Sequence, residues 1–510
     1  MRRRSGPSRQ VVLVEADDRD LEGRGEPALP TPLTGEPGDV APHPRRRWWP
    51  LLVAVALVLG LVATQAVLDA RERAHLAEIR SLPGVLLPVD QSMHALWTDD
   101  ATGSLTGAVD LGGGSVAVGA LDDSGAQVVR GVELRTGAVL WEVPVAQPEA
   151  AALAMGWSPY CEETSTPGLL ACTAYGTFAA DPDDPSGQSA VPTERHLVVV
   201  DAHAHVVRAQ HTLALEAFTT VTDNGYLAAE YADGTVTVTS HDLVSGTEQW
   251  RFDAPDEPLD DRYDNRAWVE VDGLSRLLVT GPRSTWVLSS DGTLLDTQGT
   301  LAGSGAYSRA GHARGDSGEL YYLSDVNRTV VLRADGTPGE AFDDTTINLT
   351  VDDGSAPDLF FTAGYADGGM VVRAREISDG SIRWEAPMVG AGSGGVLVDG
   401  ALHVTSLRTA TAIDAATGEV RWSHELEGTA TDGGIVTDGR VVLVVESTYE
   451  RQSLVALSLA DGTRQWQISV PTDDYLNVVA GHLCGTTFTE ETVGGAVVSR
   501  QQTTVYGVTG

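Results

Sequence analysis

The sequence predicts an all-β fold, a β-propeller of four-stranded blades that follows one transmembrane α-helix. Three observations predict it. A short hairpin pattern recurs along most of the 510 residues, a tryptophan follows the hairpin turn at a fixed offset in several copies, and one long apolar run lies near the N-terminus. A hairpin that recurs about every 40–45 residues is typical of propellers, in which each blade is a small four-stranded sheet.

The hairpin pattern is clearest in residues 412–422, which read Ala-Ile-Asp-Ala-Ala-Thr-Gly-Glu-Val-Arg-Trp. Asp414, Thr417 and Gly418 are turn residues, and glycine can adopt the positive φ that such turns require. Apolar residues on both sides of the turn predict two short strands, the second of which leads to Trp422. The segment therefore predicts a β-hairpin with an aromatic residue in its second strand.

The pattern has seven further copies. Four of them end in a tryptophan at the same offset: Trp141, Trp250, Trp384 and Trp466. Three weaker copies lack the tryptophan and have these residues at the turn position: His205, Gly292 and Gly336. The turn positions 137, 205, 246, 292, 336, 380, 418 and 462 are separated by 68, 41, 46, 44, 44, 38 and 44 residues. One small sheet cannot bury both of its faces, so repeats of this length are expected to stack in a ring.

The ends of the repeat region predict how the ring closes. Trp97 follows residues typical of an outer strand without a preceding hairpin, and residues 504–510 resemble an inner strand and turn without an outer strand. Together they complete one blade, which is added to the eight internal turn positions. The eight internal turn positions and this blade give a count of nine. Propellers usually have four to eight blades, so we expect eight and keep nine as the alternative.

The pattern Ala-x-Asp-x-x-Thr-Gly-x-x-x-Trp of residues 412–422 resembles the tryptophan-docking repeat of the PQQ-like, quinoprotein-type propeller family. That family includes quinoprotein dehydrogenases and the propeller lipoprotein of the outer-membrane β-barrel assembly machine. The resemblance covers residues 93–510. It implies that the repeat tryptophans dock one blade on the next, and these are the predicted docking residues: Trp141, Trp250, Trp384, Trp422 and Trp466. Because one fold hosts many functions, it does not set the function.

Residues 48–68 form an uncharged and almost wholly apolar run. A helix of this length spans about 32 Å, enough to cross the hydrocarbon core of a membrane. Arg45, Arg46 and Arg47 precede the run and Asp69 follows it, which predicts a cytoplasmic N-terminus. The alternative is a cleaved signal peptide. No cysteine lies near the end of the run, so the chain departs from the lipoprotein relative.

Four segments are therefore expected. Residues 1–47 form a disordered cytoplasmic tail, residues 48–69 the transmembrane helix, residues 70–90 a juxtamembrane helix and linker, and residues 91–510 the propeller. The predicted location is the cell membrane, with a single pass and the propeller outside.

Composition excludes several kinds of chemistry. The chain contains no lysine, which excludes a Walker A phosphate loop and a Schiff base formed on a lysine. The formal net charge of −37 predicts a surface that repels nucleic acid, so no nucleic-acid partner is expected.

The three cysteines predict one disulfide. Cys161 and Cys172 lie close together inside the longest repeat, in what is interpreted as an insertion of residues 157–192. Outside the cytoplasm such a pair favours a disulfide over a metal site. Cys484 lies in an apolar strand and is expected to be buried and inert.

Other residues could carry chemistry, but a structural explanation is favoured for each. Gly315-Asp-Ser-Gly318 resembles a protease nucleophile stretch and is also an ordinary turn sequence. Three histidines could bind zinc and are expected to be surface residues: His203, His205 and His211. Acidic loops at residues 253–264 and 343–353 could bind calcium and are expected to be solvated. No catalytic, cofactor-binding or metal-binding residue is predicted.

The predicted function is a non-catalytic binding or scaffold module for an envelope protein, peptide or polymer, anchored in the membrane and without a cofactor. The alternative is a quinoprotein-type oxidoreductase that uses PQQ and calcium. A third class is a structural spacer in an envelope complex.

Overall fold

The computed structural model describes residues 49–99, 105, 107–181, 190–222, 225–254, 268–271, 276–280, 284–299, 307–309, 318–323, 328–333, 338–366, 369–388, 394–448, 451–470, 475–493 and 496–508. The chain divides into two compact units, Met1–Asp69 and Ala70–Gly510. The expected tail of residues 1–47 lies outside the described residues.

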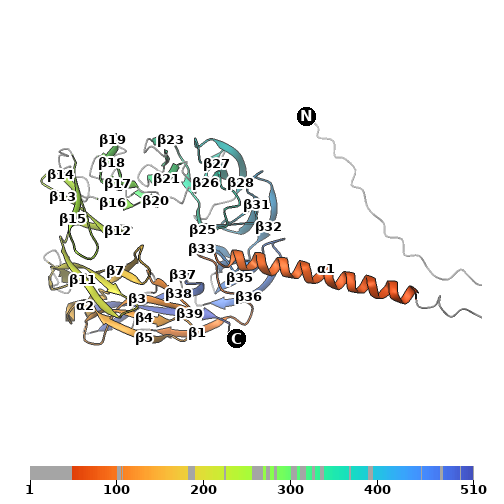
Figure 1. Cartoon of the computed structure of the whole chain (residues 1–510), viewed down its shortest axis with the longest axis horizontal. Helices are drawn as coiled ribbons and strands as arrows, with labels where there is room; N and C mark the ends of the chain where they lie inside the picture. Colours follow the sequence, from red (N-terminus) through yellow and green to blue (C-terminus); the bar gives the residue numbers. More distant parts are fainter. Residues whose placement is uncertain are drawn as a thin grey trace, which may run out of the picture. The chain divides into compact units, whose positions relative to one another are not determined.

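The N-terminal helix α1 (Trp49–Ile79) is 31 residues long. Its residues from Leu52 onward are long and apolar enough to cross a membrane. Leu57 and Leu61 are 64% and 69% exposed, as the side chains of a lipid-facing helix would be. This apolar helix agrees with the segment expected from the sequence, and Figure 1 shows it at the red end of the described chain.

The remaining unit consists mainly of small antiparallel sheets, which we number in chain order. Sheet 1 contains β2 (Val109–Gly112), β3 (Ser115–Leu121), β4 (Gln127–Glu133) and β5 (Ala138–Pro144), and helix α2 (Ala150–Met155) follows it. Sheet 2 contains β6 (Tyr160–Glu163), β7 (Leu169–Tyr175), β10 (Arg195–Asp201) and β11 (Val206–Leu213). Sheet 3 contains β12 (Phe218–Thr222), β13 (Gly225–Ala232), β14 (Thr235–His241) and β15 (Glu248–Asp253).

The middle of the chain repeats this order. Sheet 4 contains β16 (Trp268–Val271), β17 (Arg276–Thr280), β18 (Ser284–Ser289) and β19 (Leu294–Gly299). Sheet 5 contains β20 (Tyr307–Arg309), β21 (Gly318–Leu323), β22 (Arg328–Arg333) and β23 (Pro338–Phe342). Sheet 6 contains β24 (Thr345–Thr346), β26 (Leu359–Ala366), β27 (Gly369–Glu376) and β28 (Ile382–Met388).

Sheet 7 has five strands, because β25 (Asn348–Asp352) pairs in parallel with β29 (Gly394–Val398), which is followed by β30 (Ala401–Thr405), β31 (Thr409–Asp414) and β32 (Val420–Glu425). Sheet 8 contains β33 (Thr429–Thr437), β34 (Val441–Ser447), β35 (Gln452–Ser458) and β36 (Arg464–Val470). The closing sheet contains β37 (Tyr475–Val479), β38 (His482–Val493), β39 (Ala496–Gly507) and β1 (His94–Asp99).

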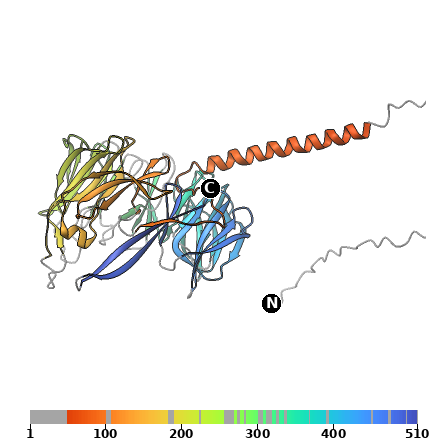
Figure 2. The same ribbon diagram turned by 90° about the horizontal axis from the view of Figure 1, so that it is seen from below.

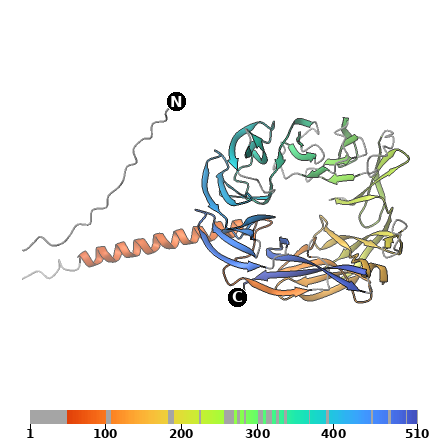
Figure 3. The same ribbon diagram turned by 180° about the vertical axis from the view of Figure 1, so that it is seen from behind.

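The predicted closure of the propeller by its two chain ends is confirmed. In the closing sheet, β1 pairs antiparallel with β39, and Trp97 lies opposite Val505. Figures 1 and 3 show this orange strand beside the blue C-terminal strands from opposite sides. Pairing the first described strand with the last ties the two ends of the unit together.

Hydrophobic clusters join the sheets in chain order. In β34, Val442 and Val444 belong to the cluster shared with sheet 7, whereas Leu443 and Val445 belong to the cluster shared with the closing sheet. Successive residues of a strand face opposite sides, so a continuous apolar run is buried between two neighbours. Similar clusters join the closing sheet to sheet 1 and connect sheets 1 to 2, 2 to 3, 3 to 4, 5 to 6 and 6 to 7.

This arrangement confirms the predicted all-β propeller of four-stranded blades. The described strands form nine sheets of four or five strands, as many as the sectors counted in the sequence. No described hydrophobic cluster joins sheet 4 to sheet 5, so the number of blades in the ring, eight or nine, stays a prediction.

The segment between sheets 1 and 3 corrects one interpretation. Residues 157–192 are not an insertion throughout, because β6 and β7 are two strands of sheet 2. The additional part is the two-stranded sheet of β8 (Phe178–Ala180) and β9 (Ala190–Pro192). The long spacing between turn positions 137 and 205 therefore contains blade strands as well as an extra hairpin.

The buried His403 predicts acid sensitivity. His403 is 1% exposed in β30, its ring lies 5.5 Å from the ring of Trp422, and its Nδ1 has no hydrogen-bond partner. Burial, with the nearby charge of Arg421, lowers the pKa of His403 from 6.5 to about 4. As the pH falls, His403 is therefore protonated in the unfolded chain before it is protonated in the folded chain. This difference should lower the free energy of unfolding by about 3 kcal/mol between pH 6.5 and pH 4.

We expect His403→Leu to reduce this acid-dependent loss, because the variant has no imidazole to protonate. Urea unfolding followed by fluorescence at pH 7 and pH 4 measures the difference. The control His94→Leu replaces an exposed histidine and is unfolded under the same conditions, so that an effect specific to the buried site can be recognised. An unchanged pH dependence in His403→Leu would contradict the assigned burial.

Candidate functional site

The repeat tryptophans lie between neighbouring sheets. The ring of Trp422 in sheet 7 covers Gly462 in a turn of sheet 8, and its Nε1 donates a 2.9 Å hydrogen bond to the carbonyl oxygen of Leu459. Gly462 has a φ of 68°, and a Cβ there would lie 2.4 Å from the ring. The turn therefore requires glycine both for its backbone conformation and for contact with the indole.

The same contact recurs between other sheets. Three further indole nitrogens donate to a carbonyl in the next sheet: Trp97 to Leu134, Trp250 to Ser290 and Trp384 to Ala415. Trp466 packs against the cluster that joins sheet 8 to the closing sheet. Trp141 stacks on His205 of sheet 2, with ring centroids 5.1 Å apart. We propose that the five predicted tryptophans dock each sheet on the next.

Two histidines take part in these contacts. His205 stands at the turn position with a φ of 56°, and Trp141 stacks on its ring. His211 lies against Gly246, and its Nε2 is 2.9 Å from the carbonyl oxygen of Leu243. In four other sheets a tryptophan nitrogen bonds to a carbonyl oxygen of the next sheet in this way. His203 instead lies against Gly168. The three candidate zinc ligands therefore contact different elements, and His211 is half-buried rather than on the surface.

The other candidate residues are also engaged structurally. Asp253 pairs with Arg251 at 3.0 Å, while the rest of that acidic loop lies outside the described residues. In the second loop, Asp353 accepts a hydrogen bond from the backbone N–H of Asp399. Among the described residues, no group of three or more His, Cys, Asp or Glu side chains could hold a metal ion. Residues 315–317 of the protease-like stretch lie outside the described residues.

The predicted disulfide is present. Cys161 in β6 and Cys172 in β7 lie opposite each other in sheet 2 and are bonded, with their Cα atoms 4.0 Å apart. Cys484 is free and buried, and burial raises the pKa of its thiol to about 12. A thiol that stays protonated and buried is a poor nucleophile, which agrees with the expected inert role.

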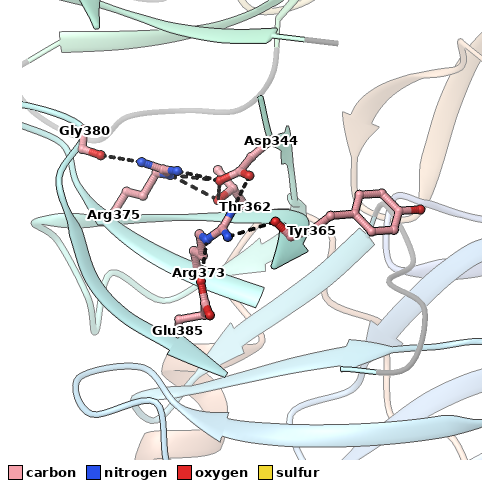
Figure 4. A network of polar contacts seen from close by, with 7 residues as sticks. All are labelled: Asp344, Thr362, Tyr365, Arg373, Arg375, Gly380 and Glu385. Atoms are coloured by element: carbon pink, nitrogen blue, oxygen red, sulfur yellow. Dashed lines mark hydrogen bonds and ion pairs between the residues drawn. The ribbon is translucent and has the colours of Figure 1, made fainter. Parts of the chain in front are cut away.

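A network of buried charges lies where sheet 6 faces sheet 5 (Figure 4). Asp344, which is 3% exposed, accepts from the guanidinium groups of Arg373 and Arg375. Arg373 also pairs with Glu385 at 2.9 Å, so two positive charges meet two negative charges. Arg375 lies 4.0 Å above the ring of Phe342 in β23.

This network is closed on itself. Arg375 donates to Asp344, to the carbonyl oxygen of Gly380 and to the hydroxyl of Thr362, so all three of its nitrogens have acceptors within the chain. In Figure 4 the ring of Tyr365 points away from the network, to which this residue contributes only its carbonyl oxygen. A buried charge network of this kind penalises any packing that separates its members, because an unpaired buried charge is costly.

The segment after the apolar part of α1 forms an unexpected contact surface. Leu76 and Ile79 at the end of α1 are buried, and Ile79 lies against Gly439 in the turn between β33 and β34. His75 Nε2 lies 2.9 Å from a carboxylate oxygen of Asp399, in the turn between β29 and β30. Arg80 donates to the carbonyl oxygen of Asp438.

The chain beyond α1 continues across the same turns. The backbone N–H of Leu86 donates to Thr437, and that of Leu87 donates to Gly481 in the turn between β37 and β38. Gly84 has a φ of 80°, and a Cβ there would lie 2.1 Å from the carbonyl oxygen of Thr350. Residues 75–87 thus contact sheet 7, sheet 8 and the closing sheet. The contacts include the turns β29–β30, β33–β34 and β37–β38, and we name this end of the sheets the juxtamembrane end.

The comparisons with known proteins agree with the repeat. Residues 367–503 match the family described as outer membrane protein assembly factor BamB. The resemblance to PQQ-like propellers is confirmed over these residues. They contain three of the five predicted docking tryptophans: Trp384, Trp422 and Trp466.

Solved structures of propellers are similar at low identity. The crystal structure of BamB from Moraxella catarrhalis is 14% identical, covers 80% of this chain and 99% of its own, and has a TM-score of 0.38. Quinohemoprotein alcohol dehydrogenase from Comamonas testosteroni is 12% identical, covers 82% of this chain and 78% of its own, and has a TM-score of 0.36. Among curated proteins, no sequence matches this chain.

The docking role of the tryptophans predicts a large effect of Trp422→Ala. The substitution removes a buried ring and its hydrogen bond and should lower the free energy of unfolding by about 3–5 kcal/mol. The control Tyr365→Ala removes a ring that is 76% exposed and should change stability by less than about 0.5 kcal/mol. Urea unfolding measures both, and equal effects would contradict the docking role.

Proposed function

We propose that this chain is a single-pass membrane protein whose propeller is a non-catalytic binding or scaffold module for an envelope protein, peptide or polymer. Residues 1–47 form its cytoplasmic tail, residues 48–69 cross the membrane, residues 70–90 are juxtamembrane, and residues 91–510 form the propeller. Arg45, Arg46 and Arg47 before the apolar run, and Asp69 after it, support a cytoplasmic N-terminus.

The observation that carries the proposal is the contact of residues 75–87 with the juxtamembrane end. Ile79 is 2% exposed, and backbone hydrogen bonds fix Leu86 and Leu87 to sheet 8 and the closing sheet. A segment packed in this way covers one end of the propeller and leaves its other end for a partner, which suits a scaffold or receptor.

Binding is favoured over oxidoreductase chemistry because several described side chains that could serve redox chemistry or bind a metal contact neighbouring sheets instead. The repeat tryptophans, His205 and His211 contact neighbouring sheets, and Asp344 neutralises two arginines. The matching family is named as a protein assembly factor, which supports a protein partner. The net charge of −37 favours a partner with basic segments and disfavours nucleic acid.

The proposed topology predicts an asymmetric protease pattern. Trypsin added to intact cells from which any outer barrier has been removed should cleave after arginines beyond residue 90 and spare residues 1–47. Permeabilised cells provide the control, in which the tail should also be cleaved. Recovery of a mature chain that begins near residue 70 would contradict the membrane anchor.

The binding role predicts a partner that stays attached when the full chain is purified from membranes in mild detergent. The ratio of partner to chain should be constant across preparations and should fall at high salt, because the proposed interaction is partly electrostatic. Uptake of PQQ with calcium and dye reduction by the purified chain would contradict the non-catalytic role.

A further inference from the structure

The strands of the closing sheet have unequal lengths. The two central strands, β38 and β39, have 12 residues each, whereas β37 has five and β1 has six. β38 and β39 pair with each other from Leu483 opposite Tyr506 to Val493 opposite Ala496. Two long central strands therefore extend beyond their shorter neighbours.

The extension forms a two-stranded arm. β37 pairs with β38 only as far as Thr486, and β1 pairs with β39 only as far as Thr503. Phe488–Val493 and Ala496–Gln501, which we name the arm, pair only with each other among the described strands. Figure 2 shows this dark blue hairpin extending past the rest of its sheet.

No described strand pairs with the outer edges of the arm. The outer edge of Phe488–Val493 offers backbone N–H and C=O groups over about 20 Å, the length of a six-residue strand. Proteins often protect such edges with proline, but neither half of the arm contains one. An added antiparallel strand on this edge would continue the line of β37 and extend the closing sheet.

The topology places the arm at the end opposite the juxtamembrane segment. Leu87 contacts Gly481 in the turn between the first and second strands of the closing sheet. The arm lies at the turn between the second and third strands. Because neighbouring strands are antiparallel, these turns lie at opposite ends of the sheet, so the arm projects away from the anchored end.

We propose that the arm is a docking site for an extended, basic segment of a partner protein, which adds as a strand to the edge of β38. The inference rests on the proposed binding function and names the partner chemistry. Glu490 and Glu491 lie in β38, while the only basic residue of the arm, Arg500, lies in β39. With a net charge of −37, a second copy of this chain is a poor occupant and a basic strand is a good one.

A defined peptide tests the arm. The probe is a ten-residue peptide of alternating arginine and valine, added to the full chain in detergent. The same peptide with glutamate in place of arginine is the control. The basic peptide should bind, and the backbone amides of Phe488–Val493 should exchange hydrogen about tenfold or more slowly in its presence.

Two variants keep the test independent of folding. Replacing residues 488–501 by Gly-Gly should leave the unfolding temperature unchanged, since no other described strand pairs with them. The replacement should weaken binding of the basic peptide about tenfold or more. The double substitution Glu490→Arg and Glu491→Arg should weaken binding of the basic peptide and allow the acidic one to bind.

Equal binding of the peptide after the arm is removed would overturn the inference, as would binding without slower amide exchange in the arm. Amide protection that increases with protein concentration alone would also overturn it, because it would indicate that a second copy of the chain occupies the edge. These outcomes are distinguishable from failure of the proposed function. A membrane partner that still co-purifies with the armless chain would leave the binding role intact and exclude only the arm.

Discussion

The structure depends on one constraint: a four-stranded sheet has two faces, and neither can be exposed if the strand is apolar throughout. The consecutive buried valines and leucines of β34 illustrate it, because alternate residues contact sheet 7 and the closing sheet. Each sheet is therefore stable only between two neighbours. We propose that a tryptophan of one sheet on a turn of the next adds direction to this stacking, as where Trp422 covers Gly462 and a Cβ would lie 2.4 Å from the ring.

Where a sheet lacks the repeat tryptophan, other side chains fill the space between it and the next sheet. His211 reaches the carbonyl oxygen of Leu243 as an indole nitrogen does in the other sheets. Between sheets 5 and 6, Arg375 over Phe342, with its carboxylate partner Asp344, fills the space with paired charge. Buried ion pairs often add less to folding stability than apolar packing does. They penalise any other alignment of sheets 5 and 6, because breaking one pair leaves a buried charge without a partner.

The sequence predicted the features that repeat and missed those that occur once. The hairpin spacing and tryptophan offsets were sufficient for the fold class, and two nearby cysteines were sufficient for the disulfide. The contact of His211 with the next sheet was not predicted, because the other copies have their tryptophan four residues after the turn position and His211 lies six residues after it. Residues two positions apart in a strand lie on the same face, so His211 can make the same contact. The contacts of residues 75–87 join segments more than 260 residues apart, and no local pattern encodes such pairing. The arm became visible only from strand register.

We propose that residues 75–87 pack on the juxtamembrane end of the propeller and that this end lies outside the cytoplasm. A cysteine pair tests both parts, since a Cβ at Gly439 would lie 3.6 Å from that of Ile79, within the range for a disulfide. The φ of 88° at Gly439 strains a cysteine there, and the control pair below carries the same strain. We expect the chain carrying Ile79→Cys and Gly439→Cys to form this bond spontaneously in intact cells, detected as a reduction-sensitive link between protease fragments. The control pair, Ala77→Cys with Gly439→Cys, should not form it, because Ala77 is exposed on the helix. Free thiols at both positions in intact cells, or equal linkage of the control pair, would contradict the account.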